Sequence, residues 1–286
     1  MSTLVLLSLT GLGLGALYFL IASGLSLIFG LADVLNFAHG LFLAVGGYAT
    51  WWAGQHLPFP VAVVVGVLAG TALAVAVELA LIRPLYARPI QQVLVTVGLA
   101  AAGVALLQAV WGADPVTFPK PTWAAGTTRV LGAAVPNDRF LLIGAALAVF
   151  AALLLFLRRT RYGLIVRAGV EDRAMVTALG IDVRIAFTLV FAIGGAAAAL
   201  AGVLAGVYFG SITPGQGGSL LIFAFIVVVI GGMGSVTGSA LAAVLVGLVQ
   251  QFANYYAASG VGEASVVLLL AVVLLARPGG LTGRVA

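Results

Sequence analysis

Residues 158–184 read RRTRYGLIVRAGVEDRAMVTALGIDVR and lie between two long apolar runs, 139–158 and 186–209. This segment holds six of the 13 basic residues and three of the eight acidic residues of the chain. A charged side chain at the centre of a bilayer costs at least roughly 2.5–3.5 kcal/mol, so a segment with this charge density cannot lie in hydrocarbon. It is therefore an aqueous excursion between two apolar segments.

The whole chain has the composition of an integral membrane protein. Hydrophobic residues make up 63% of the 286 positions, charged residues make up 7%, and the mean hydropathy is +1.24. A soluble domain carries about 25% charged residues, so water is not the main solvent of this chain. The first apolar run has no basic residue before it and is longer than the apolar core of a signal peptide, so we interpret it as a retained span.

Apolar runs of helical length recur along the chain. A helix rising 1.5 Å per residue needs about 20 residues to cross roughly 30 Å of hydrocarbon. The runs are 4–30, 37–54, 61–82, 93–111, 139–158, 186–209, 219–232, 235–256 and 263–276. Two of them, 219–232 and 263–276, are short, which favours a crossing with little tilt or a half-helix. The sequence therefore predicts an all-α fold, a polytopic transmembrane helical bundle of eight or nine spans with broken or re-entrant segments.

The basic residues orient this bundle. If 158–185 is a cytoplasmic loop and the crossings alternate, ten of the 13 basic residues are cytoplasmic, in agreement with the usual excess of Lys and Arg on that side. Residues 112–138 then form an external loop. Its four prolines forbid a long helix and predict an irregular cap with a short helix, which is either a spacer or a docking surface. The expected organisation is one transmembrane domain over residues 1–286.

The chain lacks the residues that most membrane enzymes and metal sites need. It has no cysteine and two histidines, His39 and His56, so we expect no catalytic residue, no metal ligand and no cofactor-binding residue. Its one lysine, Lys120, lies between two prolines, and the chain contains no Gly-Lys-Ser/Thr sequence. A phosphate-binding loop requires that sequence, so the chain does not bind ATP by this route.

Two breaks interrupt the apolar pattern, ADVLNFAHG (32–40) and GGMGSVTG (231–238). In transporters, interrupted apolar segments at matching positions of two halves point to the substrate path. The residues predicted to lie along a translocation path are Asn36, His39, Gly231, Gly232 and Gly234. Ordinary turns between helices are the alternative interpretation of both breaks.

Two carboxylates, Asp33 and Glu78, are candidates for ion coupling. Asp33 favours the membrane interface, because burial of its charge at the bilayer centre is costly. Glu78 lies five residues before Arg83, close enough to the cytoplasmic end of its run to be solvated. Ion coupling through either carboxylate, or a proton relay through His39, is the less favoured interpretation.

The interior of the charged segment has helical character. Apolar and charged residues are interspersed from Ile165 to Leu179, which predicts a short amphipathic helix across the inner face. Gly180 suits the left-handed position that follows a helix end, and Asp182 suits the N-cap of the next helix. Such a helix either docks onto another protein or rests on lipid.

Several separated stretches resemble known transport proteins. RAGVEDRAMVTALGID (167–182), followed by FTLVFAIGGAAAALAGVLAG (187–206), resembles the cytoplasmic coupling loop of permease subunits in ATP-binding-cassette (ABC) importers. GLSLIFGLADVLNFAHGLFLAVGGY (24–48), IGGMGSVTGSALAAVLVG (230–247) and RPGGLTG (277–283) resemble the branched-chain amino acid permeases, specifically their shorter type. The resemblance covers almost the whole chain, and related permeases carry urea or short amides.

The resemblance implies a pore-forming, multi-pass subunit of the bacterial inner (cytoplasmic) membrane that binds no ATP itself. The implied partners are a second homologous permease subunit, two cytoplasmic ATPase subunits, a periplasmic substrate-binding protein and membrane lipid, and not nucleic acid. By the same resemblance, the residues that couple the chain to the ATPase are Arg167, Glu171, Asp172, Arg173, Leu179, Gly180 and Asp182.

Three classes of function compete on these grounds. The leading hypothesis is a non-enzymatic ABC-importer permease for leucine, isoleucine, valine or a similar small polar solute. A secondary transporter of amino acids or small amides is the alternative, and it requires intramembrane carboxylates, for which only Asp33 and Glu78 are candidates. A membrane enzyme would need a nucleophile–base pair or a metal site, which two histidines and no cysteine scarcely supply.

Overall fold

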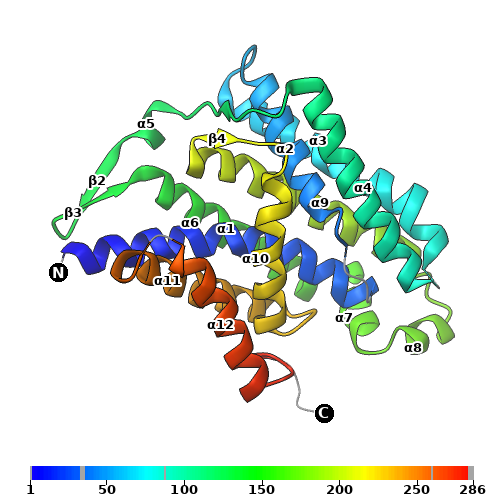
Figure 1. The fold of residues 1–286 in the computed structure, drawn as a ribbon. Helices are drawn as coiled ribbons and strands as arrows, with labels where there is room; N and C mark the ends of the chain where they lie inside the picture. The colour runs from blue at the N-terminus through cyan, green and yellow to red at the C-terminus, as the bar shows by residue number, and fades with distance from the viewer. Residues whose placement is uncertain (1, 33–35, 87, 259, 283–286) are drawn as a thin grey trace.

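The computed structural model describes residues 2–32, 36–86, 88–258 and 260–282, and helices dominate it (Figure 1). Asp33, in the first predicted break, lies outside the described residues. Within the described ranges, six helices are long and apolar enough to cross a membrane. They are built on α1 (Ser2–Ala32), α3 (Phe59–Val77), α4 (Pro89–Trp111), α6 (Asn137–Arg159), α9 (Arg184–Phe209) and α11 (Val236–Tyr256). The predicted all-α polytopic bundle is confirmed.

Three apolar helices are shorter than a full crossing. They are α2 (His39–Ala53), α10 (Gln216–Gly231) and α12 (Val261–Ala276), with 15, 16 and 16 residues. Such helices extend about 22–24 Å at 1.5 Å per residue, less than the roughly 30 Å of a hydrocarbon core. Each predicted apolar run therefore contains a helix, and the two runs expected to be short are short. The short length of α2 was not predicted.

The helix α2 begins inside the bundle rather than at its surface. The Nε2 atom of His39, the first residue of α2, lies 3.1 Å from the carbonyl oxygen of Ile21, in the middle of α1. Gly40 packs directly on Gly217 in the first turn of α10, where a Cβ on Gly40 would lie 2.6 Å from the Gly217 carbonyl oxygen. The N-terminal ends of two short helices therefore meet at depth, as in a broken or re-entrant segment.

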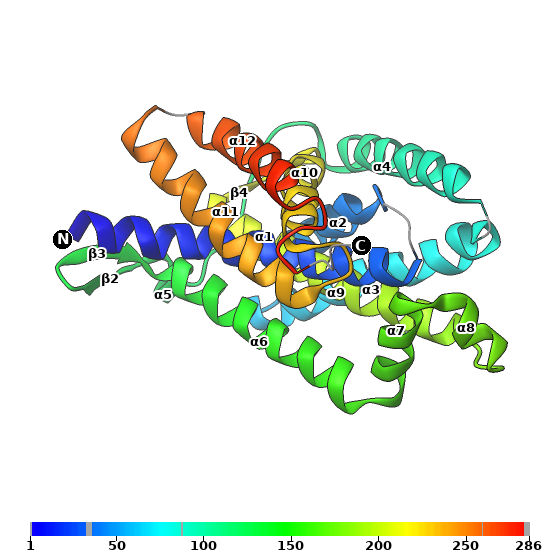
Figure 2. The same ribbon diagram turned by 90° about the horizontal axis from the view of Figure 1, so that it is seen from below.

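The helix α1 runs through the middle of the molecule, with α9, α10 and α11 packed against it (Figures 1 and 2). Glycine permits these close approaches. A Cβ on Gly24 would lie 2.5 Å from the carbonyl oxygen of Gly194 in α9, and a Cβ on Gly15 would lie 2.6 Å from that of Ala243 in α11. Small residues at helix contacts are typical of packing in lipid, where the hydrophobic effect does not drive helices together.

The predicted external loop is an irregular cap, as expected from its prolines. It contains the short helix α5 (Thr122–Ala125), and the strand β1 (Val116–Thr117) pairs with β4 (Ser211–Ile212) beyond the end of α9. A hairpin of β2 (Thr127–Val130) and β3 (Ala133–Pro136) was not predicted. Ion pairs join Asp138 at the start of α6 to Lys120 at 3.2 Å and to Arg139 at 3.4 Å. These contacts fasten the loop to the bundle.

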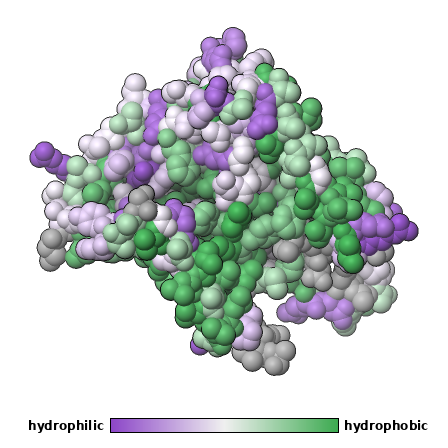
Figure 3. Space-filling view, in the orientation of Figure 1, coloured by the Kyte–Doolittle hydropathy of each residue, from purple (hydrophilic) through white to green (hydrophobic). Residues whose placement is uncertain are grey.

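The apolar residues that cannot face the core form the outer surface. Figure 3 shows hydrophobic surface over α12 and along α4, with hydrophilic surface at the lower right over the charged segment. Side chains on these helices are largely exposed, including Leu275 at 88% and Ile90 at 84%. In a soluble protein such faces would aggregate, so hydrocarbon or another membrane subunit covers them.

Candidate functional site

The charged segment forms two helices rather than the single helix predicted from Ile165 to Leu179. They are α7 (Arg161–Glu171) and α8 (Arg173–Ala178). The prediction was wrong at Asp172, whose backbone is extended (φ −154°, ψ 96°) and whose Oδ1 accepts a hydrogen bond of 2.9 Å from the Met175 amide. Asp172 is thus an N-cap, a role that aspartate fills well because its side chain satisfies a free amide of the first turn.

The end of the segment follows the prediction closely. Gly180 has a φ of +78°, the left-handed conformation expected of a glycine after a helix end. The Oδ1 atom of Asp182 accepts a hydrogen bond of 2.9 Å from the amide of Arg184, the first residue of α9. Asp182 therefore supports the start of α9, although Val183 occupies the cap position itself. Gly180 and Asp182 join α8 to the long span through a turn of fixed geometry.

The segment divides into a buried side and an exposed side. Gly163, Val166 and Gly169 of α7 and Val176 of α8 are buried against the bundle. The predicted coupling residues that are exposed are Arg167, Glu171, Asp172, Leu179, Gly180 and Asp182. The side chain of Arg173, the seventh predicted residue, lies outside the described part of the structure. Exposed apolar residues accompany the charges: Met175 is 61% and Leu179 is 69% exposed.

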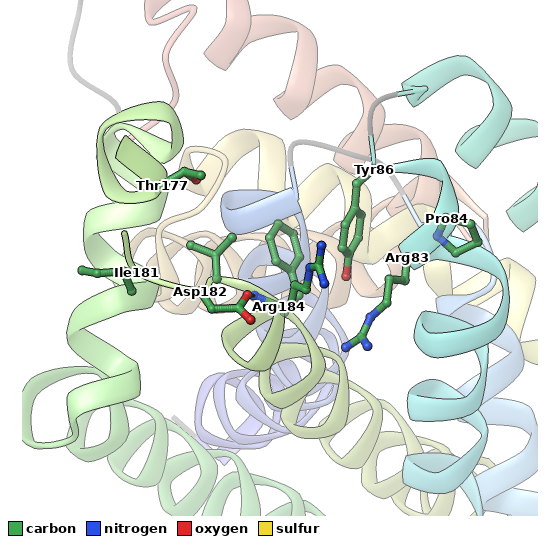
Figure 4. A pocket seen from close by; sticks show the side chains of 9 residues that line it. Arg83, Pro84, Tyr86, Thr177, Ile181, Asp182 and Arg184 are labelled. Carbon is green, nitrogen blue, oxygen red and sulfur yellow. Dashed lines mark hydrogen bonds between the residues drawn. The ribbon is translucent and has the colours of Figure 1, made fainter. Parts of the chain in front are cut away.

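An open pocket of about 860 Å³ lies beside this segment. Figure 4 shows Arg83 and Tyr86, from the turn after α3, on one wall, and Asp182 and Arg184 on the other. The pocket therefore lies between two connections that are far apart in the sequence.

A buried carboxylate holds these two connections together. Glu78 is fully buried in the π-helix η1 (Glu78–Ile82), which continues α3 and is followed by the 3-10 turn η2 (Arg83–Leu85). Its Oε1 accepts hydrogen bonds from Arg83 Nε at 3.3 Å and from the Tyr86 hydroxyl, and its Oε2 accepts one of 2.9 Å from Thr188 in α9. The prediction that Glu78 is solvated was wrong, because the chain folds these donors around it.

Replacing Glu78 with alanine is expected to lower the melting temperature of the purified protein more than Glu78→Gln does. Glutamine keeps an acceptor for Tyr86 and Thr188, whereas alanine removes it. A fully buried donor left without an acceptor costs about 1–3 kcal/mol, and the cost is smaller here because both donors are partly exposed. The contribution of Arg83 is smaller, because 37% of its side chain is exposed. Thermal unfolding followed by tryptophan fluorescence measures the difference, with Glu171→Ala as an exposed control. Equal melting temperatures for wild type and Glu78→Ala would contradict the structural role.

The second predicted break meets both α1 and the charged segment. Gly234 has a φ of +81°, and a Cβ built on it would lie 3.2 Å from the Cα of Gly30 near the end of α1. The same Cβ would lie 3.4 Å from Cγ1 of Val170 in α7. The turn between α10 and α11 is therefore in contact with the helix that carries the predicted coupling residues. Val170 was not singled out from the sequence, because an isolated valine in an amphipathic segment carries no signal of its own.

The other residues predicted for the translocation path are buried. His39 is fully buried, Asn36 is 1% exposed, and the Asn36 Oδ1 accepts a hydrogen bond of 3.0 Å from the Ala38 amide. The Asn36 Nδ2 and His39 Nδ1 atoms have no hydrogen-bond partner among the described residues. Gly231 packs on Gly238, where its Cβ would lie 2.5 Å from the Gly238 carbonyl carbon. The structure therefore places Gly231 at a helix contact.

The C-terminal motif closes over the same break. The amide of Leu281 donates a hydrogen bond of 2.8 Å to the carbonyl of Ile230, and Thr282 Oγ1 donates one of 2.7 Å to that of Gly231. Gly232 has a φ of +97°, and Gly280 of the motif packs on its backbone. The carbonyl groups at the end of α10, which lack partners within their own helix, are thus satisfied by residues about 50 positions later.

A family model described as "Branched-chain amino acid transport system / permease component" matches residues 7–277. The chain belongs to this family. The high-affinity branched-chain amino acid transport system permease protein LivH of Escherichia coli (strain K12) is 29% identical over 96% of this chain and 94% of its own length. The corresponding permease protein BraD of Pseudomonas aeruginosa is 30% identical with the same two coverages.

Among solved structures, PsaBC from Streptococcus pneumoniae in complex with Fab is similar with a TM-score of 0.49 and 14% identity. The similarity covers 93% of this chain and 89% of that chain. Membership of the family, together with the six long apolar helices, makes this permease a multi-pass membrane protein of the bacterial inner membrane. Its relatives are transport permease proteins rather than enzymes.

Proposed function

We propose that this permease is the pore-forming subunit of an ABC importer for branched-chain amino acids or a similar small polar solute. Its proposed partners are a second homologous permease subunit, two cytoplasmic ATPase subunits and a periplasmic substrate-binding protein. The observation that carries the proposal is the contact of Val170 with Gly234, which joins the charged segment to the glycine-rich turn between α10 and α11.

The exposed side of α7 and α8 supports docking to an ATPase. Apolar anchors usually supply most of the energy of a protein interface, and charges around them set its orientation. Met175 and Leu179 are exposed apolar side chains, and Arg167, Glu171 and Asp172 are exposed charged residues of both signs in the same segment.

Of the two carboxylates considered for ion coupling, Glu78 gives little support to a secondary transporter, and Asp33 lies outside the described residues. Coupling to an ion requires a carboxylate that can bind and release it. Glu78 already accepts hydrogen bonds from Arg83, Tyr86 and Thr188, so its oxygens are occupied by protein donors.

The test is reconstitution with the partner subunits in proteoliposomes. We expect leucine uptake to require the binding protein outside the vesicles and ATP inside, and the purified permease alone to hydrolyse no ATP above background. Co-purification of ATPase subunits with the permease is the accompanying structural readout. Uptake driven by a proton or sodium gradient without ATP would reject the proposal in favour of a secondary transporter.

A further inference from the structure

A second pocket, of about 640 Å³, lies at the opposite end of the bundle from α7 and α8. Ser211 of β4 lines it, and β4 pairs with β1 of the 112–138 loop, so the pocket is on the external side. Its walls come from α1, α9, α10, α11 and α12. Pockets for small molecules usually measure about 300–1,000 Å³, so this one has room for a small solute.

A chain of hydrogen bonds ends at a carboxylate in this pocket. The Tyr18 hydroxyl donates to Gln250 Oε1 at 2.8 Å, and Gln250 Nε2 donates to Glu263 Oε1 at 3.1 Å. Tyr18 is 2% and Gln250 is 5% exposed. Since Tyr18 fixes the amide of Gln250 with its oxygen toward α1, the Nε2 side is directed at Glu263. One oxygen of the exposed carboxylate thereby accepts a hydrogen bond from a buried amide, which Tyr18 orients.

Glu263 has no positive partner in the part of the chain that the structure describes. The ion pairs there involve Glu78 and Asp138. The residues that line the pocket include no lysine, arginine or histidine. Glu263 is exposed and keeps much of its hydration, and the apolar walls on one side of it strengthen its attraction for a cation relative to a carboxylate in bulk water. The pocket therefore favours a solute that carries a positive charge.

The remainder of the pocket suits the other parts of an amino acid. The Phe223 ring stacks on Tyr18, with centroids 5.1 Å apart, and Leu220 lies beside it in α10, which offers apolar contact to an aliphatic side chain. The first turn of α10 also lines the pocket and has no side-chain cap. The amides of Gln216 and Gly218 in that turn donate to the carbonyls of Thr213 and Gly215, so it is the dipole of α10 that favours a carboxylate at this end of the helix.

We infer that Glu263 binds the ammonium group of an amino acid with an apolar side chain in this external pocket. The inference rests on the proposed function for the choice of cargo. Its physical content is narrower: a primary ammonium is recognised at Glu263, and an uncharged urea or amide would gain much less there. The site would receive the zwitterion before it enters the bundle.

Cysteine protection tests this site without relying on transport. Ser219 lines the pocket and is exposed, and the chain has no native cysteine. The importer that carries Ser219→Cys is assembled and treated with a neutral methanethiosulfonate reagent in the absence of ATP and binding protein. The complex without this cysteine gives the background labelling. We expect leucine to slow labelling several-fold. We expect 4-methylpentanoate, which has the same side chain and carboxylate but no ammonium, to leave the rate unchanged.

Two further variants assign the effect to Glu263. Glu263→Gln in the Ser219→Cys background is expected to abolish protection by leucine. Asp114→Asn removes an exposed external carboxylate that does not line the pocket, so it should keep protection. The labelling rate without solute and the yield of assembled complex check that each variant folds.

The outcomes separate this inference from the proposed function. Equal protection by leucine and 4-methylpentanoate, undiminished protection in Glu263→Gln, or no protection in a complex that takes up leucine with ATP would overturn the ammonium site. Protection by leucine that depends on Glu263, in a complex that does not take up leucine, would keep the site and reject the proposed cargo.

Discussion

Replacing Gly234 with leucine is expected to abolish uptake while the complex still assembles. The backbone at Gly234 has a φ of +81°, and a Cβ there would lie 3.2 Å from Gly30 Cα and 3.4 Å from Val170 Cγ1. A Cβ alone is tight, and the further carbons of leucine must separate α1, α7 and the turn before α11. Overpacking costs about 1–3 kcal/mol, and the left-handed backbone adds about 1–2 kcal/mol. Both penalties fall on the contact that joins the charged segment to the turn between α10 and α11.

Three control variants separate the sources of this effect. Gly234→Ala keeps the backbone strain but adds only a Cβ, so it should retain part of the uptake. Gly132→Ala places an alanine at a φ of +83° where no atom lies within 4 Å, and Gly144→Leu adds leucine on α6 in open space. Both should transport like wild type. ATP-dependent leucine uptake and complex yield are the measurements, and wild-type uptake in Gly234→Leu would remove this contact from the transport mechanism.

The membrane helices were predictable because apolar length is a direct physical requirement of the bilayer. Every long apolar run became a helix, and the runs 219–232 and 263–276 proved short, as α10 and α12. The shortness of α2 was not predicted, because only His39 and Thr50 interrupt the apolar run 37–54. Tertiary contacts determine where α2 begins. His39 lies at hydrogen-bond distance from the carbonyl of Ile21, and Gly40 packs on Gly217.

Local conformational preferences predicted part of the candidate site, namely the turn at Gly180 and Asp182. Gly180 and Asp182 behave as their residue types suggest, since both roles depend on neighbours in sequence. Asp172 was misread as a helix-interior residue, although aspartate is a better N-cap than an interior residue. Contacts between distant segments carried no sequence signal: Glu78 with Thr188, Val170 with Gly234 and Gln250 with Glu263 all depend on how the helices pack. For Glu78 and Gln250, a polar residue within an apolar run indicates that a hydrogen-bond partner exists, but the sequence does not identify that partner.

The second large effect is expected at Gly180, where valine should uncouple ATP hydrolysis from uptake. Gly180 has a φ of +78°, and a Cβ added to it would meet no atom within 4 Å, so a substitution there changes the backbone and little else. A β-branched residue is a rare outlier in the left-handed region, and the cost of about 1–2 kcal/mol corresponds to roughly a 5–30-fold shift in a conformational equilibrium. The turn between α8 and α9 would therefore adopt a different backbone conformation. As a result, α8 would no longer be held in a fixed position relative to Asp182 and α9.

Gly180→Asn is the matched control for this prediction. Asparagine enters the left-handed region far more readily than valine, and the space around Gly180 accepts either side chain. We expect Gly180→Asn to keep most of the uptake and Gly180→Val to lose most of it, with equal amounts of permease in the membrane. Measuring binding-protein-stimulated ATPase activity and leucine uptake in the same vesicles distinguishes weakened ATPase docking, which lowers both, from uncoupling, which lowers uptake alone. If both variants matched wild type in both activities, the turn at Gly180 would not be part of the coupling element. A turn that transmits motion between the ATPase and α9 could not be strained without a change in ATPase activity or uptake.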